Sequence, residues 1–98
     1  MHYLMFYEFT SDYLERRSAY RNEHLRLAWE SNARGELVLG GAFAEPADGA
    51  VLLFTIDAPV VAQQFAENDP YVKNGLVTRW WIRPWTTVVG DTATAPVR

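Results

Sequence analysis

Short runs of apolar and aromatic residues, separated by polar turns, divide the chain into strand-like and helix-like segments. Four of the runs are brief and rich in aromatic and branched side chains, which predicts β-strands. They cover residues 3–9, 37–43, 50–56 and 77–88. Turn residues at 45–49 join the second run to the third, so we expect these two strands to form a hairpin. Gly40 and Gly41 predict a bulge in the second strand, or a close approach to its backbone. Pro84 predicts an edge or a bulge for the last strand.

Helix-like segments lie between these runs. The longest covers residues 13–34 and is stopped by Gly35, a residue type that often follows the last helical turn. A second helix is expected to open near Pro59, which suits a first turn, and to run to about Asn68. A one-turn helix is expected at 70–74.

The resulting order βαββαβ, with a central hairpin, is that of the ferredoxin-like arrangement. We therefore expect an α+β fold in which an antiparallel four-stranded sheet carries two helices on one face. Side chains alternate between the two faces of a strand, and the first and last runs of the sequence are apolar on both faces. In the first run, Tyr3, Met5, Tyr7 and Phe9 point to one side and Leu4 and Phe6 to the other. In the last run, Trp81 and Trp85 point to one side and Trp80 and Ile82 to the other. Because the helices bury only one face, a second copy is expected to cover the other, which predicts a homodimer.

Composition narrows the function classes. The chain has 98 residues, enough for one domain, which we place at 1–89, followed by a flexible tail at 90–98. Its formal net charge of −3 argues against nucleic-acid binding by bulk electrostatics. The absence of cysteine excludes disulfides and thiolate chemistry and suits the cytoplasm. The first residues do not resemble a signal peptide, and no apolar segment has the length of a membrane span.

One stripe of the long helix mixes basic with apolar residues. At about 100° per residue, Arg17, Arg21 and His24 fall within the apolar arc. Basic groups on an inward stripe are costly unless they are paired or hydrated. Two interpretations remain open: they lie at the margin of the stripe or pair with carboxylates such as Asp69 or Glu8, or they line a pocket for an anionic small molecule.

The Asp69-Pro70 step also has two interpretations. An Asp N-cap followed by Pro at the first helical position is a common way to begin a short helix, and this alone explains the pair. Alternatively, Asp69 orients His24, since an imidazole held by a carboxylate is a frequent proton-transfer device. His24 considered alone is more often a core histidine than a catalytic one. We expect no metal site, because the spacing of histidines is unsuitable, and no cofactor, because nucleotide-binding loops are absent.

Several spaced motifs resemble those of the YciI-like (YCII-related) family, over about residues 2–89. They are Arg17-x-x-x-Arg21-x-x-His24-Leu25, Gly35-Glu36-Leu37, Gly40-Gly41, Asp48-Gly49, Asp69-Pro70-Tyr71 and Gly75-Leu76-Val77. The resemblance implies a ferredoxin-like domain that pairs into a dimeric α+β barrel, with His24 and Asp69 facing a cleft. One branch of the family is similar to enzymes that remove chloride from chlorinated hydroxyquinols. The wider superfamily includes muconolactone isomerases and cofactor-free oxygenases.

The sequence therefore predicts acid/base chemistry without a cofactor, of the elimination, isomerisation or dehalogenation type, on an anionic or phenolic small molecule. Asp69 would orient His24 while His24 moves a proton. The expected substrate-binding residues are Arg17, Arg21, Tyr7, Gly41 and Tyr71. The main alternative is a ligand-binding or regulatory homodimer without turnover. A haem-binding barrel with His24 as axial ligand and an RNA-recognition module are weaker alternatives.

Overall fold

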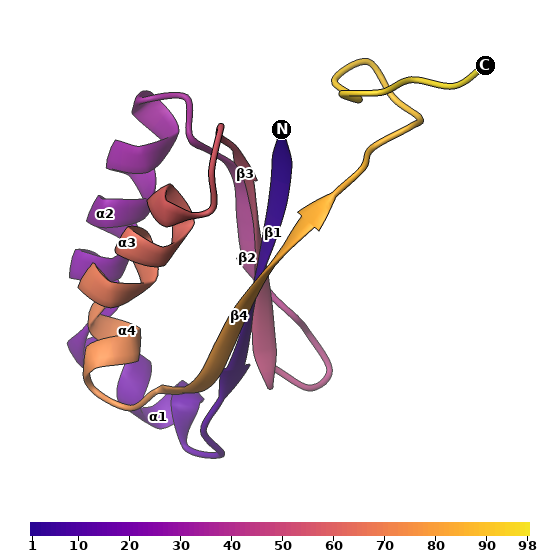
Figure 1. Ribbon diagram of the computed structural model, residues 1–98. Helices are drawn as coiled ribbons and strands as arrows, with labels where there is room; N and C mark the ends of the chain where they lie inside the picture. Colours follow the sequence, from indigo (N-terminus) through magenta and orange to yellow (C-terminus); the bar gives the residue numbers. More distant parts are fainter.

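The computed structural model describes residues 1–98 and has the predicted βαββαβ order (Figure 1). Its strands are β1 (His2–Phe9), β2 (Leu37–Ala42), β3 (Gly49–Thr55) and β4 (Val77–Trp85). They form one sheet in the order β2-β3-β1-β4, and each neighbouring pair is antiparallel. Pro84 lies in an edge strand, where the ladder tolerates the missing N–H. The ferredoxin-like α+β prediction is confirmed.

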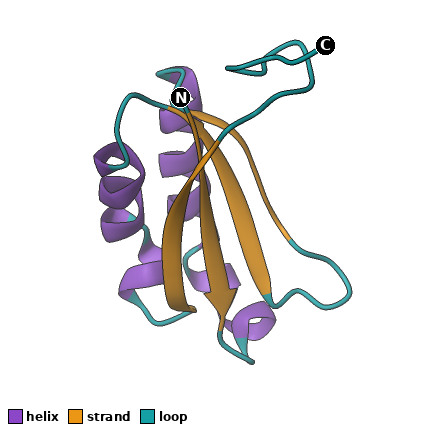
Figure 2. Ribbon diagram, turned by 45° about the vertical axis from the view of Figure 1, so that its right-hand side comes forward, coloured by secondary structure: helices purple, strands orange, loops and turns teal.

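The helices lie on one side of the sheet, and the other side carries none (Figures 1 and 2). They are α1 (Tyr13–Arg16), α2 (Arg21–Ala33), α3 (Val60–Asn68) and α4 (Pro70–Lys73), with a 3-10 turn, η1 (Arg17–Ala19), between the first two. Gly35 follows α2 with φ +79°, a left-handed conformation that glycine adopts without strain. None of these helices combines the length and the hydrophobicity that a membrane-spanning helix requires.

The prediction of one continuous helix over residues 13–34 is wrong, because Tyr20 interrupts it. Its φ of −122° and ψ of −6° lie outside the helical range. The Tyr20 N–H donates to the carbonyl of Arg17 at 3.0 Å, which is the tighter 3-10 pattern, and α2 restarts at Arg21. The Tyr20 side chain packs against the core, so tertiary contacts override the local helical pattern.

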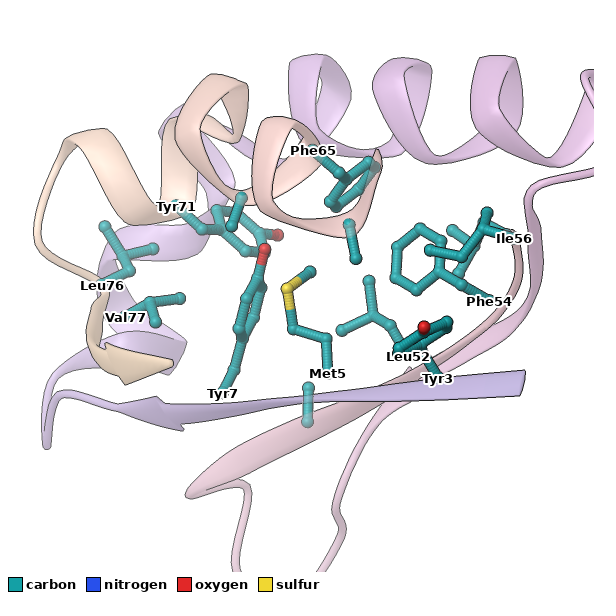
Figure 3. Packing of buried hydrophobic residues seen from close by; sticks show 14 of the residues in the cluster. Tyr3, Met5, Tyr7, Leu52, Phe54, Ile56, Phe65, Tyr71, Leu76 and Val77 are labelled. Atoms are coloured by element: carbon teal, nitrogen blue, oxygen red, sulfur yellow. The ribbon is translucent and has the colours of Figure 1, made fainter. Parts of the chain in front are cut away.

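The core lies between the helices and one face of the sheet (Figure 3). Alternate residues of β1 point toward the helices, and their partners on β3 point the same way. The buried hydrophobic residues of β1, β3 and α3 are Tyr3, Met5, Tyr7, Ala50, Leu52, Phe54, Ala62, Phe65 and Ala66. Met5 and Phe54 have no exposed surface. Burying a side chain of that size contributes about 1.5–3 kcal/mol, so this layer fixes β1 against α3.

The opposite side, which we call the open sheet face, is also apolar. Its apolar residues are Leu4, Phe6, Val51, Leu53, Trp81 and Trp85, and the charged residues Glu8, Arg79 and Arg83 lie on the same face. Phe6 and Trp81 are cross-strand partners whose rings stack with centroids 5.3 Å apart. The guanidinium of Arg79 lies 4.4 Å from the centre of the Trp81 ring. The predicted distribution of apolar residues over both faces of the sheet is therefore present.

The glycines of the hairpin differ from the prediction. The register irregularity of β2 lies between Leu37 and Leu39, so no bulge occurs at Gly40 and Gly41. The close backbone approach is at Gly49 instead, where an added Cβ would lie 2.4 Å from the carbonyl oxygen of Tyr7. At Gly41 an added Cβ would meet no atom within 4 Å.

The last strand ends at Trp85 rather than at Val88, because Trp85 pairs with His2 and β1 offers no residue beyond it. The segment that follows folds back on itself: the N–H groups of Ala95 and Val97 donate to the carbonyls of Thr87 and Val88. Thr87 is buried, and its Oγ1 lies 2.8 Å from Nδ1 of His2. The flexibility of residues 90–98 stays a prediction.

Candidate active site

A cavity of about 470 Å³ opens between the segment α1–η1–α2 and the β2 side of the sheet. Nineteen residues line it, and thirteen of them are hydrophobic. Six of the seven predicted site residues are among them: Tyr7, Arg17, Arg21, His24, Gly41 and Tyr71. The seventh, Asp69, lies behind the cavity wall and is fully buried. The site thus draws on residues between Tyr7 and Tyr71, which are far apart in the sequence.

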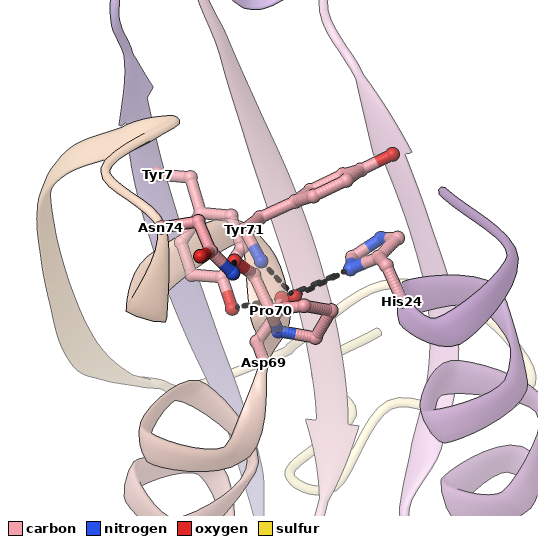
Figure 4. Close-up of polar contacts among 6 residues, drawn as sticks. All are labelled: Tyr7, His24, Asp69, Pro70, Tyr71 and Asn74. Carbon is pink, nitrogen blue, oxygen red and sulfur yellow. Dashed lines mark hydrogen bonds and ion pairs between the residues drawn. The ribbon is translucent and has the colours of Figure 1, made fainter. Parts of the chain in front are cut away.

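His24 and Asp69 form a bonded pair (Figure 4). The imidazole Nδ1 lies 2.9 Å from each carboxylate oxygen of Asp69. An ionised carboxylate only accepts hydrogen bonds, so Nδ1 carries the proton that it donates. The other ring nitrogen, Nε2, has no partner within the chain, and no buried side-chain nitrogen lacks a partner. Nε2 is therefore the nitrogen that solvent or a ligand in the cavity reaches.

Asp69 also performs the helix-capping role that was the competing interpretation. It joins α3 to α4 in an extended conformation, with φ −72° and ψ 121°, and Pro70 takes the first position of α4. Its Oδ1 accepts the backbone N–H of Tyr71 at 2.9 Å. One carboxylate therefore caps the short helix and holds the imidazole, so the two interpretations do not exclude each other.

Tyr7 supplies a third donor to the same carboxylate. Its hydroxyl donates to Oδ2 of Asp69 at 2.8 Å, and its side chain is buried (Figure 4). Burial and the negative charge of Asp69 raise the pKa of Tyr7 far above its usual value, so the phenol keeps its proton. Tyr7 lines the cavity, but its hydroxyl is engaged with Asp69 rather than directed to a ligand.

Tyr71 covers one face of the imidazole. Its ring stacks on His24 with the centroids 4.0 Å apart and the planes inclined by 11°. Burial and the neighbouring Tyr13 phenol raise the pKa of Tyr71 to about 12. The ring of Tyr71 and the carboxylate of Asp69 together leave His24 little freedom to rotate.

Arg17 and Arg21 line the cavity without an ion-pair partner in the chain. By contrast, Arg26 on the outer side of α2 pairs with Glu23 and Glu30. Neither cavity arginine pairs with Asp69 or with Glu8, which instead contacts Arg79. The guanidinium of Arg17 lies 5.8 Å from the ring centre of Tyr13. The cavity therefore has an uncompensated positive charge that suits an anionic group.

Other residues of the site are not identified by sequence reasoning. Asn32 donates from its side chain to the carbonyl of Leu37 at 2.9 Å and ties the end of α2 to β2 beside the cavity. Gly49 allows the close packing of the Tyr7 backbone. Tyr13 also lines the cavity. The contacts of Asn32 and Gly49 depend on tertiary structure, so no local sequence pattern indicates them. No group of three His, Cys, Asp or Glu side chains in the chain could hold a metal ion.

Comparison with solved structures gives a clear match of fold. The 5-chloro-2-hydroxyhydroquinone dehydrochlorinase of Burkholderia phenoliruptrix AC1100, solved in complex with 2,5-dihydroxybenzoquinone, aligns with a TM-score of 0.75 and 21% sequence identity. The alignment covers 89% of this chain and 95% of that chain. No curated protein matches the chain in sequence. The sequence model of the YCII-related domain matches residues 1–86, and the chain belongs to the YCII-related family.

Proposed function

We propose that this protein is a cofactor-free small-molecule enzyme in which His24 and Asp69 carry out acid/base chemistry on an anionic or phenolic compound. The observation that carries the proposal is the hydrogen bond between the Nδ1 of His24 and the buried carboxylate of Asp69, which leaves Nε2 free at the cavity. Reaction classes that need only one movable proton suit this arrangement: elimination, isomerisation and dehalogenation.

In this mechanism Nε2 of His24 removes a proton from an acidic hydroxyl or from an activated carbon of the substrate. The imidazolium that results is stabilised by Asp69 and by the ring of Tyr71. Electrons of the broken bond move into the conjugated system as a phenolate or enolate forms. In an elimination, this electron pair forms a new π bond while the bond to the leaving group breaks. The electron pair of that second bond departs with an anion such as chloride, and His24 retains the proton.

Arg17 and Arg21 support the same proposal. They line the cavity together with His24 and have no carboxylate partner. Guanidinium groups stabilise an oxyanion most strongly where little water is present, and most residues of this cavity are hydrophobic. Both arginines therefore suit a role in binding the substrate and in balancing the charge that develops on it.

The cavity size and fold relatedness favour a single-ring substrate. A volume of about 470 Å³ lies in the range of small-molecule pockets. The similarly folded dehydrochlorinase was solved with 2,5-dihydroxybenzoquinone, a planar compound with acidic hydroxyl groups. We therefore propose phenolic or quinonoid rings that bear an acidic hydroxyl or a carboxylate as the first compounds to examine.

We also propose that the functional unit is a homodimer in which two open sheet faces pack together. An antiparallel sheet tolerates one solvated face, but that face is normally polar. Here Phe6, Trp81 and aliphatic residues lie on it among a few charged side chains. Covering this surface with a second copy would remove it from water and complete a barrel of eight strands.

The direct test is a substrate screen by mass spectrometry. Chlorinated hydroxyquinols, hydroxybenzoquinones and hydroxylated benzoates would be incubated with the protein, and binding would be measured in parallel by thermal shift. Conversion that is lost in His24→Gln supports the proposal. Binding without conversion across the panel would instead indicate a ligand-binding or regulatory homodimer.

A further inference from the structure

Two tyrosines of β1 face the helices, and they differ in what their hydroxyl groups do. Tyr3 and Tyr7 are both buried and lie on the same side of the strand. The Tyr7 hydroxyl donates to Asp69, whereas the Tyr3 hydroxyl makes no hydrogen bond within the chain. The pair thus provides an internal comparison, in which one phenol is connected to the site and the other serves packing alone.

The carboxylate of Asp69 is held at both oxygens. Oδ1 accepts the N–H of Tyr71 at 2.9 Å, and Oδ2 accepts the hydroxyl of Tyr7 at 2.8 Å. Nδ1 of His24 lies 2.9 Å from both oxygens and is shared between them. Each donor offsets part of the carboxylate charge that the imidazole experiences. Of the three donors, only Tyr7 contacts Oδ2 without also contacting Oδ1.

We propose that Tyr7 is a positioning residue that acts through Asp69, fixing the orientation of the carboxylate and setting the pH at which His24 takes up its second proton. The proposal assigns Tyr7 a role different from direct contact with substrate, and it rests on the proposed function of His24 as the base. The proton of Tyr7 stays in place during turnover, because burial raises the pKa of this phenol.

The backbone of Tyr7 is fixed strongly enough for this role. Tyr7 pairs with Ala50 across the β1–β3 ladder, and its carbonyl oxygen packs against Gly49, where no side chain would fit. The hydroxyl then spans from the sheet to the loop between α3 and α4, where Asp69 lies. The chain of contacts Tyr7–Asp69–His24 therefore connects the central strand with the cavity (Figure 4).

The direction of the effect follows from the sign of the O–H dipole. Its positive end faces Oδ2, so replacing Tyr7 by Phe makes the carboxylate more negative toward His24 and favours the imidazolium. We expect the midpoint of the His24 titration in Tyr7→Phe to rise by about 0.5–1 pH unit. The acidic limb of the pH profile for turnover should move upward by the same amount, because less free base is present at a given pH.

The experiment is a nitrogen-15 NMR titration of the imidazole groups, which requires no substrate. The chain has two histidines, so His24→Gln identifies the signal of His24. Tyr3→Phe is the matched control, since it removes a hydroxyl from the same strand without removing a hydrogen bond. The proposal predicts an upward shift in Tyr7→Phe and no shift in Tyr3→Phe. An unchanged midpoint in Tyr7→Phe, or an equal shift in both variants, would overturn it.

A second substitution covers the case in which Tyr7→Phe does not fold. Placing 3-fluorotyrosine at position 7 preserves the size of the ring and makes the phenol a stronger donor. The midpoint of His24 should then shift downward, opposite to the effect of Phe, and no change would count against the proposal. The titration and the turnover assay can fail independently. A shifted His24 midpoint in the Tyr7 variants, with no turnover by the native protein, would leave the role of Tyr7 intact and refute the catalytic role of His24.

Discussion

The side chain of Tyr71 stacks on the imidazole of His24 with ring centroids 4.0 Å apart, while its backbone N–H donates to Asp69. Both contacts come from one residue at the start of α4, directly after Pro70. The short helix therefore orients the carboxylate through its first turn and the imidazole through its first aromatic side chain. This relationship explains why a four-residue helix lies at the centre of the site.

Replacing Tyr71 tests that stacking contact. Tyr71→Leu removes the aromatic face but keeps the backbone N–H, so the protonated imidazole loses a favourable interaction of roughly 0.5–2 kcal/mol. The midpoint of the His24 titration, measured by NMR, should fall by about 0.5 pH unit or more. Tyr71→Phe retains the ring and serves as the control. Equal effects of Leu and Phe would show that the ring face does not matter.

Gly49 should be essential for stability, whereas Gly41 should not. A methyl group at Gly49 would lie 2.4 Å from the Tyr7 carbonyl oxygen, so the two strands must separate to admit it. We expect Gly49→Ala to lower the free energy of unfolding by about 1–3 kcal/mol in urea denaturation. Gly41→Ala, with no atom within 4 Å of the new methyl group, should change it by less than about 0.5 kcal/mol. Similar losses at both positions would contradict this description of the hairpin.

Alkaline pH should destabilise the fold through the buried tyrosines. Burial and the Tyr13 phenol raise the pKa of Tyr71 to about 12 from 10.0, and the pKa of Tyr7 is raised further. A group with a raised folded-state pKa contributes its full stabilisation below the unfolded value and loses it as the pH rises through the folded value. For Tyr71 that window lies between about pH 10 and 12.

The measurement is the free energy of unfolding at several pH values, combined with the ultraviolet absorbance of tyrosinate. Each tyrosine proton that the unfolded chain releases and the folded chain retains should lower the free energy of unfolding by about 1.4 kcal/mol for every pH unit. Tyr7→Phe should make the slope shallower because one such proton is gone. Identical tyrosinate titration curves for the folded chain and the chain in urea would rule the effect out.

Charge at the cavity should govern ligand affinity. With 2,5-dihydroxybenzoquinone as the probe, Arg21→Gln and Arg17→Gln should each weaken binding by about tenfold, equivalent to about 1.4 kcal/mol. Isothermal titration calorimetry at two salt concentrations measures this loss. Arg26→Gln is the matched control, since Arg26 lies on the outer side of α2 and is already paired with Glu23 and Glu30. A loss in the control equal to that at Arg21 would indicate a general charge effect.

The open sheet face should mediate self-association. Trp81→Glu places a charge beside Phe6, and sedimentation velocity should then detect monomers where the native chain forms dimers. Leu14→Glu, which changes an exposed apolar residue of α1, should leave the dimer intact. A native chain that sediments as a monomer at micromolar concentration would refute the dimer proposal.

The sequence allowed much of this structure to be predicted, for identifiable reasons. Strand alternation correctly separated Tyr7 from Phe6 and Trp81 from Trp80, because a period of two is set by the backbone itself. Helical spacing grouped Arg17, Arg21 and His24, and all three line the cavity even though Tyr20 breaks the helix between them. Arg21 and His24 lie in the same helix, α2, whereas Arg17 reaches the cavity from the 3-10 turn before it.

What could not be predicted depends on contacts between distant segments. The residues around Asp69 favour a helix cap over a partner for His24, and only the packing of α4 against α2 shows that Asp69 is both. The hydroxyl of Tyr7 was expected to face a ligand, yet no local pattern indicates that it reaches Asp69 across 62 positions in the chain. Likewise, the adjacent Gly40 and Gly41 predicted a bulge or a close backbone approach, whereas the close approach is at Gly49.

The most direct measurement of the central claim is the turnover of a substrate found by screening, compared among the native protein, His24→Gln and Asp69→Asn at equal ligand occupancy. General-base catalysis contributes about 10²- to 10⁴-fold, so His24→Gln should lose at least a hundredfold in kcat while binding and fold are retained. Asp69→Asn, which keeps the size of the side chain, should also lose most of the activity. Turnover by His24→Gln within a few-fold of the native rate would contradict the role of this imidazole as the proton-transfer group.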